Sequence, residues 1–152
     1  MALPNIFTSE VTNGLISRIN HLSPDSTPAW GKMSVDQMLA HCNVTYEMAF
    51  ENKHPKPNPL MKLIMKAFIK NVVVSEKPYK RNSQTAPAFI IKDARNFEIE
   101  KSRLIAYLQK TLELGEEHFD GKESLSFGHL NSTEWNNMFY KHLDHHLTQF
   151  NV

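Results

Sequence analysis

The segment 132–149 constrains the fold of this chain most, because its inward stripe contains histidines as well as apolar residues. Trp135 and Phe139 recur at helical spacing, and His142 and His146 continue the same stripe. Side chains four residues apart stack on one face of an α-helix, with Cβ atoms roughly 5–6 Å apart. Burying imidazole nitrogens without a partner costs free energy. The segment therefore predicts an amphipathic helix whose buried face binds a partner through two histidines.

The remainder of the chain also favours helix. It has 152 residues with only five glycines, and no run of alternating apolar and polar residues suggests sheet. Ser34 and Gln37 form a capping box. Asn96 or Asp93 is expected to begin the third long helix, and Ser132 or Thr133 the fourth. We predict an all-α fold, a four-helix bundle that occupies residues 1–152 as one domain. Its long helices are expected at about 9–21, 34–50, 97–114 and 132–149.

The connection between the second and third helices is too long for a tight hairpin. It contains a short amphipathic segment, 60–73, with Lys62, Lys66 and Lys70 at spacing four. We expect a short helix that packs across the bundle with solvated lysines. The alternatives are a membrane-surface helix or a clamp for an anionic substrate, and Met61 and Met65 could line a pocket wall.

Charge and cysteine content exclude several classes of protein. The formal net charge is +1, which gives no support for a nucleic-acid partner. The single cysteine, Cys42, rules out an internal disulfide and fits a reducing compartment. We find neither a signal peptide nor an apolar stretch of about 18 residues. These features predict a cytoplasmic protein without a membrane span.

Eight histidines are present, and one of them completes a metal site with the two on the last helix. His41 lies in the middle of the second helix, on a face shared with Met38 and Met48. A single buried histidine is more often a hydrogen-bonded core residue, but three on two inward faces favour a metal. We therefore predict that His41, His142 and His146 bind one divalent ion. Three protein ligands leave positions open for water or substrate. Neutral imidazoles suit zinc, nickel, copper and iron, of which we favour zinc or nickel.

Three residues near this site are candidates for contact with a bound cofactor or substrate. Gln149 lies one turn beyond His146 and could orient a bound water or a ligand imidazole. His145 is expected at the rim, and Tyr46 toward the site end of the second helix. Cys42 diverges from His41 by about 100° around the helix, so we expect a core residue rather than a nucleophile. Glu47 is expected on a solvated flank, and no catalytic residue is assigned.

Three motifs resemble a known superfamily. His142-Leu-Asp-His145-His146-Leu-Thr-Gln149 is similar to the last-helix pattern of the DinB/YfiT-like superfamily. Trp30-Gly-Lys-Met33-Ser-Val-Asp-Gln37-Met-Leu-Ala-His41 resembles the start of the second helix in an uncharacterised DinB-like branch, a domain of unknown function. Phe127-Gly128-His129-Leu130 with Thr133-Glu134-Trp135 resembles the segment before the last helix. The resemblance extends from about Leu15 to Phe150.

The resemblance implies a four-helix bundle of DinB/YfiT-like type with a divalent metal on His41, His142 and His146. It also implies that a homodimer can form. Some members of the superfamily are enzymes that use a low-molecular-weight thiol, which the metal holds as thiolate. In this chain Leu147-Thr148 stands where Arg-Gly is frequent, so no role of an arginine is carried over.

Three functions remain open from the sequence. The first is a metal-dependent enzyme, such as a transferase, that acts on a small molecule with a thiol. The second is a metal-dependent hydrolase that activates water on the same ion. The third is a non-catalytic stress-response module that binds a metal or a small ligand.

Overall fold

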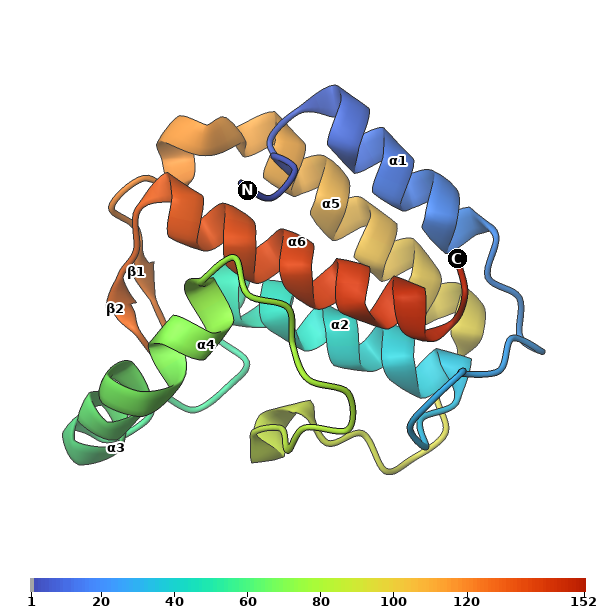
Figure 1. Cartoon of the computed structure of the whole chain (residues 1–152), viewed down its shortest axis with the longest axis horizontal. Coiled ribbons are helices and arrows are strands. Elements are labelled where there is room, and N and C mark those ends of the chain that lie inside the picture. Colours follow the sequence, from blue (N-terminus) through green and yellow to red (C-terminus); the bar gives the residue numbers. More distant parts are fainter. Residues whose placement is uncertain (1) are drawn as a thin grey trace.

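Four long helices form the main body of the protein. The computed structural model describes residues 2–152 and is mainly helical, in agreement with the predicted all-α class. Helix α5 contacts α1, α2 and α6, and α6 also contacts α1 and α2. We call these four helices the helical body (Figure 1). They are α1 (Ser9–Asn20), α2 (Val35–Phe50), α5 (Phe97–Phe119) and α6 (Ser132–Gln149).

The connection between α2 and α5 carries further short elements, of which residues 59–74 form a projection that we call the arm. The arm consists of α3 (Pro59–Ile64), the π-helix η1 (Met65–Ile69) and α4 (Lys70–Val74). It is followed by residues 75–95, the strap, which crosses in front of the body and contains the 3₁₀-helix η2 (Pro87–Phe89) (Figure 1). Helix α4 packs against α6, and η2 against α2.

The helix ends follow local capping chemistry. Thr8 accepts a hydrogen bond from the amide of Val11, and Asn96 caps α5 as predicted. The cap of α6 is Asn131, one residue before the predicted Ser132, because its side chain reaches the amide of Glu134 at 2.9 Å. An amide oxygen at this position satisfies a backbone donor that the helix itself leaves unpaired.

Two local features differ from the sequence expectation. The third long helix ends near residue 114 in its regular part, where Gly115 has a φ of 72°, but one more turn continues the element to Phe119. A short hairpin then joins α5 to α6, with β1 (Glu123–Ser124) paired antiparallel to β2 (Gly128–His129). Strands of two residues are too short to produce an alternating pattern in the sequence.

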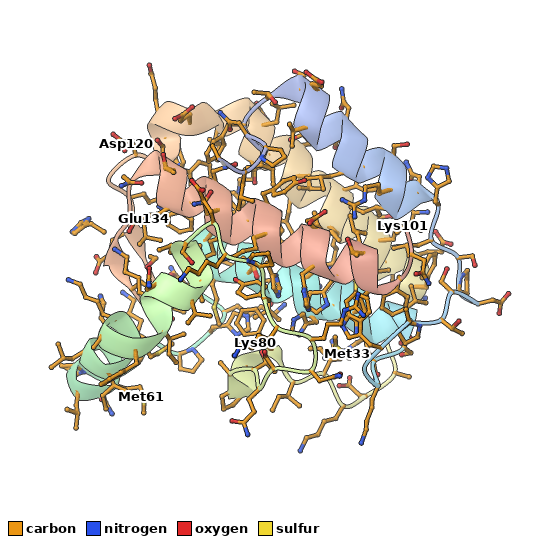
Figure 2. The ribbon with its side chains drawn as sticks, in the orientation of Figure 1. Met33, Met61, Lys80, Lys101, Asp120 and Glu134 are labelled. Atoms are coloured by element: carbon orange, nitrogen blue, oxygen red, sulfur yellow. The ribbon has the colours of Figure 1, made fainter. Side chains whose placement is uncertain are left out.

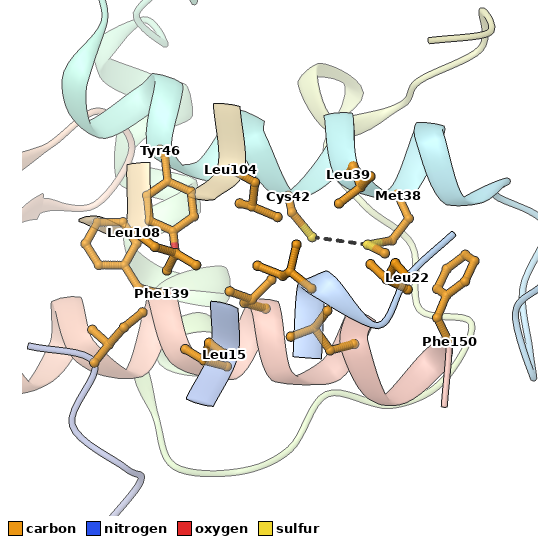
Figure 3. Packing of buried hydrophobic residues seen from close by; sticks show 14 of the residues in the cluster. Leu15, Leu22, Met38, Leu39, Cys42, Tyr46, Leu104, Leu108, Phe139 and Phe150 are labelled. Carbon is orange, nitrogen blue, oxygen red and sulfur yellow. Dashed lines mark hydrogen bonds between the residues drawn. The ribbon is translucent and has the colours of Figure 1, made fainter. Parts of the chain in front are cut away.

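The core of the body is an aromatic and aliphatic cluster between α1, α2, α5 and α6. The ring of Tyr46 stacks on Phe139 at 4.9 Å (Figure 3). It also stacks on Tyr107 at 5.6 Å. Cys42 is fully buried, with its Sγ 3.7 Å from the sulfur of Met38. Burial raises the pKa of the Cys42 thiol far above its usual range, so this side chain is a core residue, as predicted, and no nucleophile.

The arm contradicts the expectation that its apolar side packs across the bundle. None of the residues of α3 and η1 is buried. Lys62 and Lys70 instead point to the body, where they form ion pairs of 2.6 Å with Glu123 and 2.7 Å with Glu134. Lys62 and Lys70 therefore face the protein, and most apolar side chains of α3 and η1 face outward, whereas Met65, Val73 and Val74 pack against the core. Within residues 2–152, no helix combines the length and the apolar character needed to cross a bilayer.

Candidate metal centre

The structure brings together the three histidines that the sequence singled out. His41 comes from the middle of α2, and His142 and His146 from the last turns of α6. Their candidate ligand nitrogens all lie within 4.8 Å of one another, and the Nε2 atoms of His41 and His142 are 3.0 Å apart. Zinc binds imidazole nitrogen at about 2.0–2.1 Å, so a small side-chain adjustment would place all three around one ion.

Two of the three rings are held in a fixed tautomer by their neighbours. The Nδ1 of His41 lies 2.8 Å from the carbonyl oxygen of Phe89. A carbonyl only accepts, so this nitrogen carries the proton. The Nδ1 of His146 lies 2.8 Å from Oε1 of Gln149, whose Nε2 donates to the carbonyl of Trp30 at 2.7 Å. That donation fixes the orientation of the amide, so His146 must also donate from Nδ1. Both rings therefore keep the lone pair on Nε2.

The third ring, that of His142, is held by a hydroxyl group that can either donate or accept a hydrogen bond. The Nδ1 of His142 lies 3.0 Å from the hydroxyl of Thr45, one turn after His41 on α2. Because Nε2 of His41 only accepts, the 3.0 Å contact requires His142 to donate from its own Nε2. The Thr45 hydroxyl then donates to Nδ1. Rotation of this hydroxyl would let His142 move its proton to Nδ1 and offer Nε2 to a metal.

Gly31 makes the Gln149 contact possible. Its φ is 83°, in the left-handed region, and a Cβ there would lie 2.5 Å from the Gln149 side-chain nitrogen. Any other residue would push the amide away from the Trp30 carbonyl. The amide of Ala29 also donates to the main-chain carbonyl of Gln149 at 2.8 Å. The loop before α2 is therefore fastened to the end of α6, where it supports His146.

Burial keeps the three imidazoles neutral. Desolvation lowers the pKa of His41, and it lowers the pKa of His142 well below its usual range, with further lowering from His146 and His41. For His146, desolvation and then the neighbouring His41 lower the pKa to about 3, against a smaller opposite effect of Gln149. Neutral imidazole is the form that binds a metal. The donor set, its protonation and its supports all fit a divalent transition metal.

The strap contributes residues that sequence reasoning missed. Phe89 supplies the carbonyl for His41, and its ring packs edge-on against His41 and His142 at 5.3 and 5.7 Å. The ring of Tyr79 lies edge-on to His142 at 6.4 Å and to His145 at 5.7 Å. No regular pattern identifies such residues in a loop. Their aromatic character in a polar segment was the only available signal.

A pocket adjoins the histidines on the outer side of α6, with His145 as a predicted rim residue in its wall. The His145 ring lies 5.8 Å from Trp30 and 5.1 Å from His146. Desolvation lowers the pKa of His145. The pocket is lined by Trp30, Pro78, Tyr79, Arg81, Lys141, Asp144, His145 and Thr148.

Tyr46 does not contact this pocket, contrary to the sequence expectation. Its side chain is 1% exposed within the aromatic stack of the core, and its hydroxyl has no hydrogen-bond partner among the described residues. The reason is rotational. Thr45 points to His142, and the next residue on a helix is turned by about 100°, which directs Tyr46 between Tyr107 and Phe139.

Glu47 is not on a solvated flank either. It is 4% exposed and pairs with Lys53, His54 and Arg103. Although burial opposes it, hydrogen bonds from Lys53, Arg103 and His54 hold the pKa of Glu47 at about 2. A carboxylate engaged by these three donors is a poor proton acceptor, so this residue is part of a polar network with Lys53 and Arg103 rather than a general base.

The fold and the site together define a helical protein with a buried histidine group that could hold a metal ion. The chain belongs to the family described as "Protein of unknown function (DUF1569)", which it matches over residues 7–152. No curated protein and no solved structure matches the chain. The site must therefore be interpreted from its own chemistry.

Proposed function

We propose that this protein is a metal-dependent enzyme, a bundle of DinB/YfiT-like type in which His41, His142 and His146 hold one divalent ion, zinc or nickel. One observation carries the proposal. Three neutral imidazoles converge, and each has its Nδ1 on a separate partner. The lone pair of Nε2 is free on His41 and His146, and it becomes free on His142 once the proton of that ring moves to Nδ1 beside the Thr45 hydroxyl. Supporting acceptors of this kind are typical of metal-binding histidines.

A small thiol is the substrate or co-substrate that the site favours. A divalent ion bound there would act as a Lewis acid and stabilise a coordinated thiol as its thiolate. All three ligands would be neutral nitrogen atoms. The ion would therefore keep its full positive charge, which favours binding of an anion such as a thiolate. The pocket wall formed by Trp30, Tyr79 and His145 would receive the rest of the small molecule.

The hydrolase alternative would use water on the same ion, which a metal can itself ionise near neutral pH; it is less well supported because no carboxylate of the described residues is positioned to assist the attack as a general base. Among residues 2–152, no carboxylate forms a hydrogen bond with any of the three histidines. Glu47 is engaged by cations, and Asp144 pairs with Arg18 at 2.7 Å. A thiol has an ordinary pKa near 8.5, so metal coordination alone is enough to ionise it at neutral pH.

A cytoplasmic location would supply such a thiol, and the unpaired Cys42 is compatible with a reducing compartment. The homodimer implied by the resemblance remains a prediction, as does the absence of a nucleic-acid partner.

Cobalt substitution tests the proposal directly. We expect the untagged protein to bind one equivalent of Co²⁺ and to show visible absorption of a low-coordinate site. Addition of 2-mercaptoethanol should produce a new thiolate-to-cobalt band in the near ultraviolet. Ethylene glycol, which has the same shape with oxygen in place of sulfur, is the matched control and should leave the spectrum unchanged.

Other outcomes would overturn the thiol proposal. The hydrolase would be indicated if 2-mercaptoethanol left the cobalt spectrum unchanged and the protein hydrolysed an activated ester in a way that depends on His142. Bound metal without either response would indicate a non-catalytic binding module. Failure to bind Co²⁺, Zn²⁺ or Ni²⁺ would refute the metal site itself.

A further inference from the structure

The arm carries an unusual amount of exposed apolar surface. Phe68 is 76% exposed and Leu60 is 68% exposed. Seven of the nine large apolar residues that are exposed among residues 2–152 belong to the arm: Leu60, Met61, Leu63, Ile64, Phe68, Ile69 and Val72. Exposed apolar side chains concentrated in one short segment are typical of a surface that binds a partner or a membrane.

The arm is held firmly at its base, so this surface is presented in a fixed direction. The ammonium of Lys141 donates to the carbonyls of Val72 and Ser75, and the Asn137 side chain donates to the carbonyl of Val74 at 2.9 Å. Met61 lies at the far end of the arm, away from the helical body (Figure 2). A loosely attached segment could fold its apolar residues back onto the protein, but this one is fastened by α6.

Charge is concentrated in the same part of the chain. Residues 52–92 contain nine of the 17 lysine and arginine residues but only one of the 16 acidic residues, which gives this segment a formal charge of +8. The remaining residues carry −7, so the overall charge of +1 hides a strong asymmetry. Seven of these cations are exposed: Lys53, Lys56, Lys66, Lys77, Lys80, Arg81 and Lys92. The arm and the strap extend on the same side of the helical body, opposite α1 (Figure 1).

We infer that the arm docks on the surface of an anionic lipid bilayer, with its apolar side chains in the interfacial region and the surrounding lysines on the headgroups. Apolar burial combined with attraction to anionic lipids is the basis of interfacial helix binding. This mode needs no spanning segment, in keeping with the short helices of the arm. It is independent of the proposed metal chemistry.

A second copy of the chain fits the same surface less well. A two-fold interface places the same patch of both copies face to face. Two segments rich in exposed cations would then meet, and juxtaposed like charges oppose association. A bilayer that contains anionic lipid offers apolar depth and negative charge together, so it complements both properties of the arm.

Vesicle flotation of the full chain tests this inference. The vesicles are phosphatidylcholine and phosphatidylglycerol in a three to one ratio, with pure phosphatidylcholine as the comparison. We expect the bound fraction to be at least tenfold higher on the anionic vesicles and to fall as salt is added, because salt screens surface charge. Leu63→Ser with Phe68→Ser, and separately Lys56→Glu with Lys66→Glu, should each lower binding about tenfold.

Matched controls come from elsewhere on the surface. Ile99 is 58% exposed on α5 and Lys32 is exposed before α2, so Ile99→Ser and Lys32→Glu should leave binding unchanged. Circular dichroism establishes that every variant is folded. Absence of flotation with anionic vesicles would overturn the inference. So would a dimer in sedimentation that Phe68→Ser dissociates while vesicles have no effect, which would assign the arm to a contact between copies.

Discussion

The candidate metal centre places polar side chains inside the protein, whereas the arm leaves apolar side chains outside it. Each arrangement costs free energy unless something compensates for it. At the centre the compensation is visible within the chain, since the Nδ1 atoms of His41, His142 and His146 all have hydrogen-bond partners. On the arm the compensation must come from outside, because α3 and η1 bury none of their residues. The hydrogen bonds of the three histidines thus lie within the chain itself, whereas the exposed apolar side chains of the arm suit a surface outside the chain.

The largest effect is expected when a histidine of the candidate metal centre is removed, because the protein should then lose its bound metal. His142→Ala and His146→Ala are each expected to reduce bound zinc or nickel from one equivalent to none, because two imidazoles hold an ion weakly. Elemental analysis of untagged protein measures the content, and circular dichroism reports the helices. His129→Ala, at an exposed position of the hairpin, is the control and should keep its metal. Retention of one equivalent in either site variant would refute the assignment.

The same phenylalanine-to-alanine substitution should destabilise the protein far more in the core of the helical body than on the arm. Phe139→Ala removes a ring that stacks on Tyr46 and packs against Trp135 in the core, so we expect a loss of about 3–5 kcal/mol in the free energy of unfolding. Phe68→Ala removes an exposed ring and should change it by less than about 0.5 kcal/mol. Urea denaturation compares the two. A loss of several kcal/mol in Phe68→Ala would mean that the arm packs against the body.

The stability of the metal-free protein should depend on pH through the buried histidines. Burial lowers their pKa in the folded state, so the unfolded chain binds more protons and acid favours unfolding. Stability is then lost as the pH falls below the unfolded value of 6.5 toward the folded one. With a folded pKa of about 3, His146 alone should account for about 2 kcal/mol between pH 7 and pH 5. Denaturation at both pH values measures this, and His129→Ala should show the same slope. A stability that is independent of pH in this range would contradict it.

The smallest effect is expected at the hydroxyl that holds His142. Thr45→Val keeps the shape of the side chain but removes the contact to Nδ1, and we expect about tenfold weaker zinc binding. Competition with a chromophoric chelator measures the affinity. Thr133→Val, at an exposed position in the first turn of α6, should bind zinc like the wild type. Equal affinities of the two variants would show that the hydroxyl does not support the ligand.

The sequence by itself determined the long helices and the three histidines. Helical spacing, capping residues and the inward stripe are local properties, so His142 and His146 could be assigned to one buried face before any fold was known. His41 followed from the same reasoning on α2. The resemblance to the DinB/YfiT-like superfamily pointed to the same residues.

Only the tertiary structure decided the rest. The carbonyl of Phe89 reaches His41 across 48 positions of the chain, and the Gln149 amide reaches Trp30 across 119. No periodicity records such contacts. The sequence also left undetermined which face of the arm contacts the helical body. An amphipathic pattern predicts an apolar face and a polar face, but it does not predict which of them packs against the protein. Ion pairs of Lys62 and Lys70 with the body settled that choice. Rotation about α2 likewise directed Tyr46 into the core while Thr45 reached His142.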